Sequence, residues 1–477
     1  MNLLMVLRIL GVLLLCESVS MLPSILIAII YGEKTIFAFV FSILITATLG
    51  WFLFLCRTKD KMVRYKEGFV VVTFGWLLVS VFGALPFLFT GTLPSFIDAF
   101  FETVSGFTTT GATVIPNVEI LPKSLLFWRS FTNWLGGMGI LVLALAIQPA
   151  LGVGTFQIFK AETPGPILAK LTPRVSNTAK VLYTTYFAIT LAEIFLLVIG
   201  GMPLFDSVVN TFGTLGTGGF SIKNLSIGTY NSVYYELVIG IFMIAAGVNF
   251  SLYYLIFKRR SPAGLFRNKE LKVYLSIIAA YIAVITLNIY GNVFGSIVES
   301  LRHAFFQVAS IITTTGYTST DFVLWPDLSR ALLVSLTFIG ACAGSTAGGM
   351  KVIRVYLVFR YVQREVNRLI HPRAVKAINI NGVPVQENVL SSVMAFTVLY
   401  IFIFIVGTLL LTTQKIDLVS SAASVAATLG NNGLSGPSWS YAPFNIFTKV
   451  ILSFCMILGR LEIFTVLSLL FPQFWRR

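Results

Sequence analysis

Charged residues are scarce in this chain. Of its 477 residues, 11% are charged and 56% are hydrophobic, and the mean hydropathy is +0.88. A soluble protein of this size could not bury so much apolar surface. The composition therefore excludes a soluble globular domain and predicts a multi-pass protein of the lipid bilayer.

Histidine and cysteine are rarer still, with two and four residues. The cysteines lie in or beside apolar segments, without the spacing of a disulfide framework or a metal site. An intramembrane enzyme would need clustered histidines, cysteines or acids at membrane depth, and the sequence contains no such cluster. Its nearest candidate for a phosphate-binding loop, GACAGSTAGG (340–349), lacks the Gly-Lys-Ser/Thr ending. We therefore expect neither an enzyme nor an organic cofactor.

Acidic residues are outnumbered by basic ones, 19 against 34, which leaves a net charge of +15. The basic residues gather in short links between apolar segments, near 57–66, 160–180, 258–272 and 351–376. No basic stretch is long enough to form a nucleic-acid-binding domain, so we expect no nucleic-acid partner. The distribution follows the positive-inside rule and predicts that these links are cytoplasmic.

Ten apolar segments are long enough to cross a bilayer, which takes roughly 20 residues. Two form an opening hairpin at 3–31 and 36–56. The other eight are predicted to be the outer and inner helices of four repeats, the outer ones at 67–90, 181–200, 272–290 and 388–412, and the inner ones at 125–148, 232–257, 328–357 and 443–470. An even number of spans puts both termini on one side, and Arg476 and Arg477 predict that this side is the cytoplasm.

A polar stretch with a glycine separates each outer segment from its inner partner. The four stretches are TTTGAT, TGGFS, TTTGYTST and TLGNNG, around Gly111, Gly219, Gly316 and Gly430. Thirteen residues before these glycines stand Asp98, Asp206, His303 and Asp417. Each stretch is too long for a turn and too short to cross twice, so we predict re-entrant pore helices followed by extended loops.

The predicted fold is therefore an all-α membrane protein. It has four pseudo-repeated helix–pore loop–helix units around one central pore, plus an N-terminal transmembrane hairpin (1–66). The repeats are expected at 67–160, 161–260, 261–376, which includes a gating loop, and 377–477.

The loops have the chemistry of a cation filter. Backbone carbonyls can replace the water of a dehydrated cation without a fixed charge, and glycine lets consecutive carbonyls point the same way. The loops contain no Lys or Arg, which argues against an anion pore. Any one glycine could be only a helix C-cap, but four in matched contexts predict K⁺ ligands at Thr110, Gly111, Gly218, Gly219, Thr315, Gly316, Leu429 and Gly430. The three aspartates are expected to be N-caps of the pore helices, and His303 a cap or packing residue.

A gate is predicted beneath this filter. The third inner segment is rich in glycine, and each glycine costs a helix about 1 kcal/mol relative to alanine. We expect a broken helix there, although glycines spaced four apart also fit close helix packing. Arg460 lies in the last inner segment, where a charge rarely faces lipid. Glu462, two residues away, does not share its helix face. We therefore predict that Arg460 lies in the pore and contacts a gating loop made of Gly344, Ser345, Thr346, Ala347, Gly348 and Gly349.

Three other cations, Arg129, Arg330 and Lys449, lie at the outer ends of inner segments. Interfacial anchoring is the role predicted for them. The basic link from Lys351 to Lys376, with seven Lys and Arg residues, is a further candidate, as a dock for an acidic or nucleotide-bearing partner.

The chain resembles the Trk/Ktr/HKT cation transporters, and within them the TrkH-type membrane subunits of bacterial Trk potassium uptake systems. Besides the four loops, the resemblance rests on NWLGGMGILVLALAIQP (133–149), AETPGP (161–166), GACAGSTAGGMKVIR (340–354) and GRLEIFT (459–465). It covers nearly the whole chain. The resemblance implies potassium uptake across the inner membrane, a homodimer and a cytosolic nucleotide-binding regulator of the TrkA type.

The resemblance also bears on ion selectivity. In related plant proteins a serine at the first-loop position accompanies sodium selectivity, and this chain has Gly111 there, which implies potassium. A sodium-selective, or sodium- or proton-coupled, transporter of the same superfamily is the alternative. The fourth loop departs most from the pattern, because Asn431 and Asn432 follow Gly430.

Overall fold

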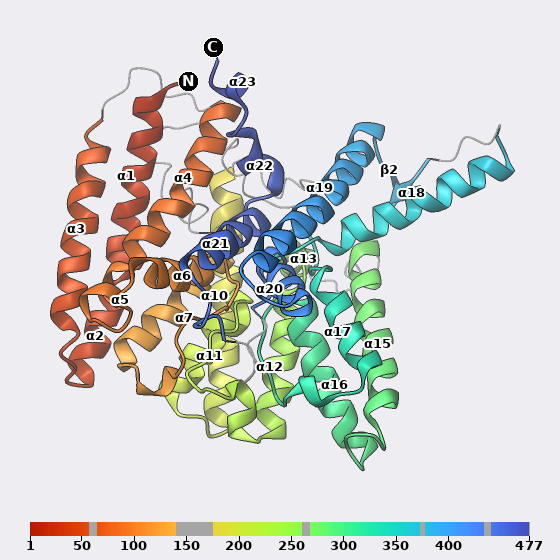
Figure 1. Ribbon diagram of the computed structural model, residues 1–477, viewed down its shortest axis with the longest axis horizontal. Helices are drawn as coiled ribbons and strands as arrows, with labels where there is room; N and C mark the ends of the chain where they lie inside the picture. The colour runs from red at the N-terminus through yellow and green to blue at the C-terminus, as the bar shows by residue number, and fades with distance from the viewer. Residues whose placement is uncertain (57–63, 140–174, 260–267, 373–376, 434–439, 477) are drawn as a thin grey trace.

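In the computed structural model the protein is mostly helical (Figure 1). The structure describes residues 1–56, 64–139, 175–259, 268–372, 377–433 and 440–476. The predicted repeat boundaries after residues 160 and 260 lie outside these ranges, and the one after 376 lies at the edge of one. The first boundary, after residue 66, falls in the first turn of a helix that begins at Tyr65.

The N-terminal hairpin consists of α1 (Leu3–Ser20), α2 (Leu22–Ile30) and α3 (Ile36–Phe54). Helices α1 and α3 lie side by side (Figure 1). Gly11 of α1 faces Gly50 of α3 so closely that a Cβ atom on Gly11 would collide with the α3 backbone. This close approach explains why small residues stand at the crossing.

Four helices follow the positions predicted for the outer helices. They are α4 (Tyr65–Gly83), α10 (Val175–Ile199), α15 (Lys269–Ile289) and α19 (Glu387–Thr412). With α1–α2 and α3, all or most of each of these helices is long and apolar enough to cross a membrane, which makes six candidate spans within the described residues. The predicted hairpin and outer helices are therefore present as continuous spans.

The inner helices are shorter and interrupted. They are α7 (Lys123–Gly137), α12 (Val233–Ala246) with α13 (Phe250–Arg259), α17 (Asp327–Thr337) with α18 (Val352–Ile370), and α21 (Ile446–Arg460) with α22 (Ile463–Ser468). The prediction of continuous inner spans is wrong for the second and the fourth, whereas the third has the break that was predicted for it. Their breaks fall at Gly247, at the glycine-rich run after Thr337, and at Glu462, whose φ of 62° lies outside the helical region. The rest of the first predicted inner span, 125–148, passes beyond residue 139 and out of the described residues.

Four short helices lie between the outer and inner ones: α6 (Phe96–Phe107), α11 (Leu204–Gly216), α16 (Ile297–Ile312) and α20 (Leu418–Leu429). These are the predicted pore helices. Each packs against two inner helices, in the cyclic order α6, α7, α11, α12, α16, α17, α20, α21 and back to α6. The four units therefore close around one axis, with the C-terminal residues of the pore helices fully buried, including Phe107, Leu215, Ile312 and Leu429.

The remaining elements are short. They are α5 (Leu85–Phe89), α23 (Pro472–Trp475), single 3₁₀ turns at Val118–Ile120, Ser226–Tyr230 and Phe322–Leu324, and an antiparallel hairpin of β1 (Asn379–Ile380) and β2 (Val383–Pro384). Helix α18 extends away from the body of the molecule, and both termini lie on the same side (Figure 1).

Candidate functional site

The four pore helices end in loops with one shared backbone conformation. Shortly after each helix comes a residue in the left-handed region, with φ of 56°, 54°, 57° and 51° at Thr109, Thr217, Thr314 and Asn431. The next amide, of Thr110, Gly218, Thr315 and Asn432, donates to the carbonyl five residues earlier at 2.8, 3.0, 2.9 and 2.7 Å. Non-glycine residues seldom adopt this conformation. Its fourfold recurrence establishes which positions correspond between the loops.

The glycine register in the fourth loop differs from the one predicted. Gly111, Gly219 and Gly316 follow the shared turn and have φ of 83°, 65° and 84°. The residue at that place in the fourth loop is Gly433, and Gly430 instead caps α20 with a right-handed φ of −77°. The prediction counted thirteen residues from each aspartate to the filter glycine. This count selected the wrong glycine in the fourth loop because Asp417 precedes its helix, whereas Asp98 and Asp206 are the third residues of theirs.

The four glycines bring the loops into a closed ring. A Cβ atom on Gly111 would collide with the carbonyl oxygen of Gly218, and one on Gly219 with that of Thr315. Likewise, a Cβ on Gly316 would meet the oxygen of Gly433, and one on Gly433 would meet the oxygen of Thr110. Each contact reaches the next loop, and the fourth returns to the first. Only glycine allows so close an approach, so the ring gathers backbone carbonyls from all four loops.

Side chains form hydrogen bonds within and between these loops. The Thr108 and Thr110 hydroxyls are 2.8 Å apart, as are those of Thr313 and Thr315. In the fourth loop, Asn431 donates to the Thr110 hydroxyl at 3.0 Å. Asn432 similarly donates to the carbonyl of Ile311, also at 3.0 Å. The two asparagines that depart from the hydroxyl pattern therefore connect the fourth loop to the first loop and to the third pore helix, α16.

The glycine-rich segment between α17 and α18 is not helical and lies against the ring. The amide of Gly348 donates to the hydroxyl of Thr314 at 2.9 Å, and a Cβ atom on Gly348 would collide with the side chain of Asn431. Gly344 and Gly349 have φ of 73° and 67°. The predicted break in the third inner helix is present, and it places residues 344–349 in contact with the third and fourth loops.

Arg460 joins three parts of the site with one guanidinium group. It donates to the carbonyl of Thr346 at 2.7 Å and to the hydroxyl of Thr109 at 3.2 Å. It also donates to the carbonyls of Gly136 and Gly137 at the C-terminal end of α7, where the helix dipole favours a cation. Glu462 bonds to Arg354 at 2.5 Å, so it is not the partner of Arg460. Arg460 and residues 344, 345 and 347–349 line one cavity.

Of the three aspartates predicted to be N-caps of pore helices, one is an N-cap in the structure. Asp417 is the N-cap of α20 and accepts from the Ser420 amide at 3.0 Å, which confirms its prediction and lowers its pKa. The cap predictions are wrong for Asp98, which accepts from Lys449 at 2.7 Å, and for Asp206, which accepts from Tyr230 at 2.8 Å. His303 is a packing residue, stacked on Phe294 with ring centroids 4.8 Å apart.

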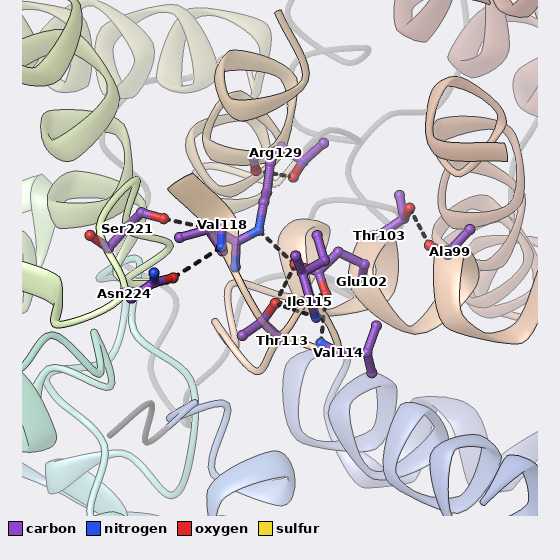
Figure 2. A network of polar contacts seen from close by, with 11 residues as sticks. Ala99, Glu102, Thr103, Thr113, Val114, Ile115, Val118, Arg129, Ser221 and Asn224 are labelled. Atoms are coloured by element: carbon purple, nitrogen blue, oxygen red, sulfur yellow. Dashed lines mark hydrogen bonds and ion pairs between the residues drawn. The ribbon is translucent and has the colours of Figure 1, made fainter. Parts of the chain in front are cut away.

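Two of the predicted interfacial anchors are buried cations that form ion pairs. The side chain of Arg129 is 3% exposed and bonds to Glu102 at 2.6 Å (Figure 2). That of Lys449 is 8% exposed and bonds to Asp98. The anchoring prediction is wrong for both. An acid inside each pore-helix segment was the sequence signal for such a pair, because a buried carboxylate needs a partner. Arg330, with 44% exposure, pairs on the surface with Asp327.

Comparison with known proteins identifies the family. The family model for TrkH, described as a cation transport protein, matches residues 32–475. The chain belongs to the TrkH family. Family relatives include the Trk system potassium uptake proteins TrkH of Halomonas elongata, 39% identical over 100% of both chains, and of Escherichia coli K12, 39% identical over 98% of both. The crystal structure of the potassium transporter TrkH from Vibrio parahaemolyticus has a TM-score of 0.90 and 36% identity, covering 100% of both chains.

Membership in the TrkH family bears on three predictions. The predicted resemblance is confirmed by the family model and by full-length relatives. The predicted all-α membrane fold is confirmed by the likeness to the solved transporter. Because the family is one of transport proteins, the prediction that this chain is not an enzyme is confirmed as well.

Proposed function

We propose that this protein takes up K⁺ across the inner membrane, and that the ion passes through the ring of four loops. The full-length relatives are potassium uptake proteins, which supports potassium as the substrate. The observation that carries the proposal is the closed ring, in which each loop's glycine packs against a carbonyl of the next loop. Such a ring suits a dehydrated monovalent cation, because carbonyl oxygens can replace its water.

The proposed K⁺ ligands are carbonyls at Thr110, Gly111, Gly218, Gly219, Thr315 and Gly316. In the fourth loop the shared register favours Asn432 and Gly433 over Leu429 and Gly430. The carbonyl of Leu429 lies against Gly459, and the Cα of Gly430 faces the carbonyl of Thr337. Both therefore face neighbouring helices, whereas Gly433 packs against the first loop.

Residues 344–349 and Arg460 form the proposed gate. The segment contacts the third and fourth loops, and Arg460 holds the carbonyl of Thr346 beside the first loop. A guanidinium group close to the ion path repels cations until it moves. Opening then requires that the Thr346 bond be exchanged for another partner, so gating couples to the position of α18, which continues from this segment.

We propose that both termini are cytoplasmic, that the protein is a homodimer, and that a cytosolic TrkA-type nucleotide-binding protein regulates it. The termini share one side of the molecule (Figure 1), and the positive-inside rule favours the cytoplasm. Helix α18 offers a docking element for the regulator. It carries exposed Phe359, Val362 and Val366 and a row of arginines at Arg360, Arg364 and Arg368.

The test is ion flux into liposomes that hold the purified chain. Potassium and rubidium should enter much faster than sodium, without an imposed sodium or proton gradient. Equal sodium and potassium flux would overturn potassium selectivity and favour the sodium-selective alternative. Potassium flux that appears only with a sodium or proton gradient would instead favour the coupled alternative.

A further inference from the structure

A buried ion pair lies directly behind the first two loops. Glu102 of α6 and Arg129 of α7 bond at 2.6 Å, with side chains 1% and 3% exposed. Figure 2 shows that both side chains also bond to residues of the loops. Glu102 accepts from the Thr113 hydroxyl at 2.9 Å and from the Val114 amide at 2.9 Å.

Arg129 extends the same network to the second loop. Its Nη1 donates to the carbonyl of Ser221 at 3.0 Å, and its guanidinium carbon lies 3.5 Å from the centre of the Phe220 ring. Thr113 is two residues beyond Gly111, and Ser221 is two residues beyond Gly219. The pair therefore links corresponding positions of two neighbouring loops.

Close to the ring, two other junctions contain neutral hydrogen bonds. The hydroxyl of Tyr317 donates to the carbonyl of Phe220 at 3.3 Å, between the third and second loops. The amide of Tyr441 donates to the carbonyl of Thr113 at 3.2 Å, between the fourth repeat and the first loop. Lys449, the partner of Asp98, also donates to the carbonyl of Ala442 at 3.1 Å, but Ala442 lies nine residues beyond Gly433. Among the ion pairs of the described residues, only Glu102–Arg129 bonds to residues within three positions after a ring glycine.

We propose that Arg129, held by Glu102, is a specificity-determining positioning residue that sets the spacing of the first and second loops. A planar guanidinium fork can bond to the carboxylate and the carbonyl at once, which fixes both loops relative to one rigid group. Since a carbonyl ring discriminates between ions through the arrangement of its oxygens, a change in loop spacing alters selectivity. This inference rests on the proposed potassium filter.

The pair could instead act through its charges, and two substitutions separate the explanations. Arg129→Gln leaves a buried negative charge, and Glu102→Gln leaves a buried positive one. A purely electrostatic role would shift the apparent K⁺ affinity in opposite directions. A positioning role lowers the K⁺/Na⁺ selectivity in both variants, because each breaks the link between Thr113 and Ser221.

A matched control is available in the same molecule. Glu236 of α12 and Arg302 of α16 form a second, partly buried ion pair at 2.6 Å, in which Nε and Nη2 of Arg302 each donate to one carboxylate oxygen of Glu236. Within the part of the chain that the structure describes, neither side chain bonds to a loop of the ring. Arg302→Gln therefore removes an ion pair of the same length but leaves the bonds between Arg129, Glu102 and the first two loops in place.

The experiment measures relative K⁺, Rb⁺ and Na⁺ flux in liposomes, with thermal stability recorded for each variant. Arg129→Gln and Glu102→Gln should each lower the K⁺/Na⁺ ratio by about tenfold, the lower range for loss of an outer-shell partner of a metal site. Arg302→Gln should keep the parent ratio. If either glutamine variant fails to fold, Arg129→Lys takes its place, since lysine keeps the charge but not the fork.

The outcomes are distinct. A parent chain without potassium selectivity would sink the proposed function itself. A selective parent whose Arg129 and Glu102 variants keep the parent ratio would overturn only the positioning role. Opposite shifts of affinity at constant selectivity, or an equal loss of selectivity in Arg302→Gln, would overturn it as well.

Discussion

Replacing Gly111 by alanine or serine gives a sharp test of the ring. Its φ of 83° places any side chain in the left-handed region, which costs about 1–2 kcal/mol. The added Cβ atom would also collide with the carbonyl oxygen of Gly218. Because non-bonded atoms keep about 3.5 Å apart, that oxygen must move by roughly 1 Å or more. The substitution therefore disturbs a proposed ligand of the neighbouring loop.

Gly91 supplies the matched control. Its φ is 70°, so alanine there carries the same kind of backbone cost, but no atom lies within 4 Å of an added Cβ. Gly91→Ala should lower thermal stability by about 1–2 kcal/mol and leave ion selectivity unchanged. Comparing the two variants separates backbone strain from displacement of the ring.

The assay is relative K⁺ and Na⁺ flux in liposomes at equal protein content. Gly111→Ala and Gly111→Ser should lose at least about tenfold in K⁺/Na⁺ selectivity, because moving a ligand costs no less than losing an outer-shell partner. A Gly111 variant with the parent ratio would refute the assignment. Equal loss in Gly91→Ala would show that strain alone, and not the ring, controls selectivity.

Four further outcomes are expected. Gly433→Ala should lower K⁺/Na⁺ selectivity as Gly111→Ala does, because its Cβ would meet the backbone of the first loop; a selective Gly433 variant would restore Gly430 as the candidate. Arg460→Ala, or a deletion within 344–349, should raise K⁺ flux in unregulated liposomes, since the bond to Thr346 is lost; unchanged flux in folded protein would place the constriction elsewhere. Asp417→Ala should cost about 1 kcal/mol of stability through the lost N-cap, measured by thermal unfolding against Asp417→Asn, which retains a capping oxygen; equal stability of the two would argue against the cap. ATP or ADP should change flux only when the cytosolic partner is present, and a nucleotide response of the chain alone would contradict the partner proposal.

The fourth loop shows how the ring accommodates an unequal repeat. Asn431 takes the left-handed position that threonine holds in the other three loops, and asparagine tolerates that conformation better than most residues. Its amide also bonds to the Thr110 hydroxyl and to the carbonyl of Met456. Asn431→Ala would therefore remove both a residue that tolerates the left-handed conformation and two hydrogen bonds to other elements. Asn431 thus stabilises the contact between the fourth loop and its neighbours, although its sequence departs from the threonine pattern.

Much of the architecture follows from the amino-acid sequence by itself. The hairpin and the outer helices could be predicted because long apolar runs need no partner to identify them as membrane spans. The four re-entrant segments could be predicted because a polar stretch between two spans has few structural options in a bilayer. The break near Gly344 could be predicted from local helix propensity. Each of these inferences depends on residues that are neighbours in the chain.

The tertiary structure decided what depends on residues far apart in the chain. Spacing alone selected Gly430, and only the contact between Gly433 and the first loop identified the position that completes the ring. The partners of Lys449 and Asn431 lie 351 and 321 residues away, so no local pattern could reveal them. Likewise, Arg129 at the end of a span resembles an interfacial anchor until Glu102 is found beside it. A buried charge or polar group is stable only with its partner in place, and the folded chain determines which partner that is.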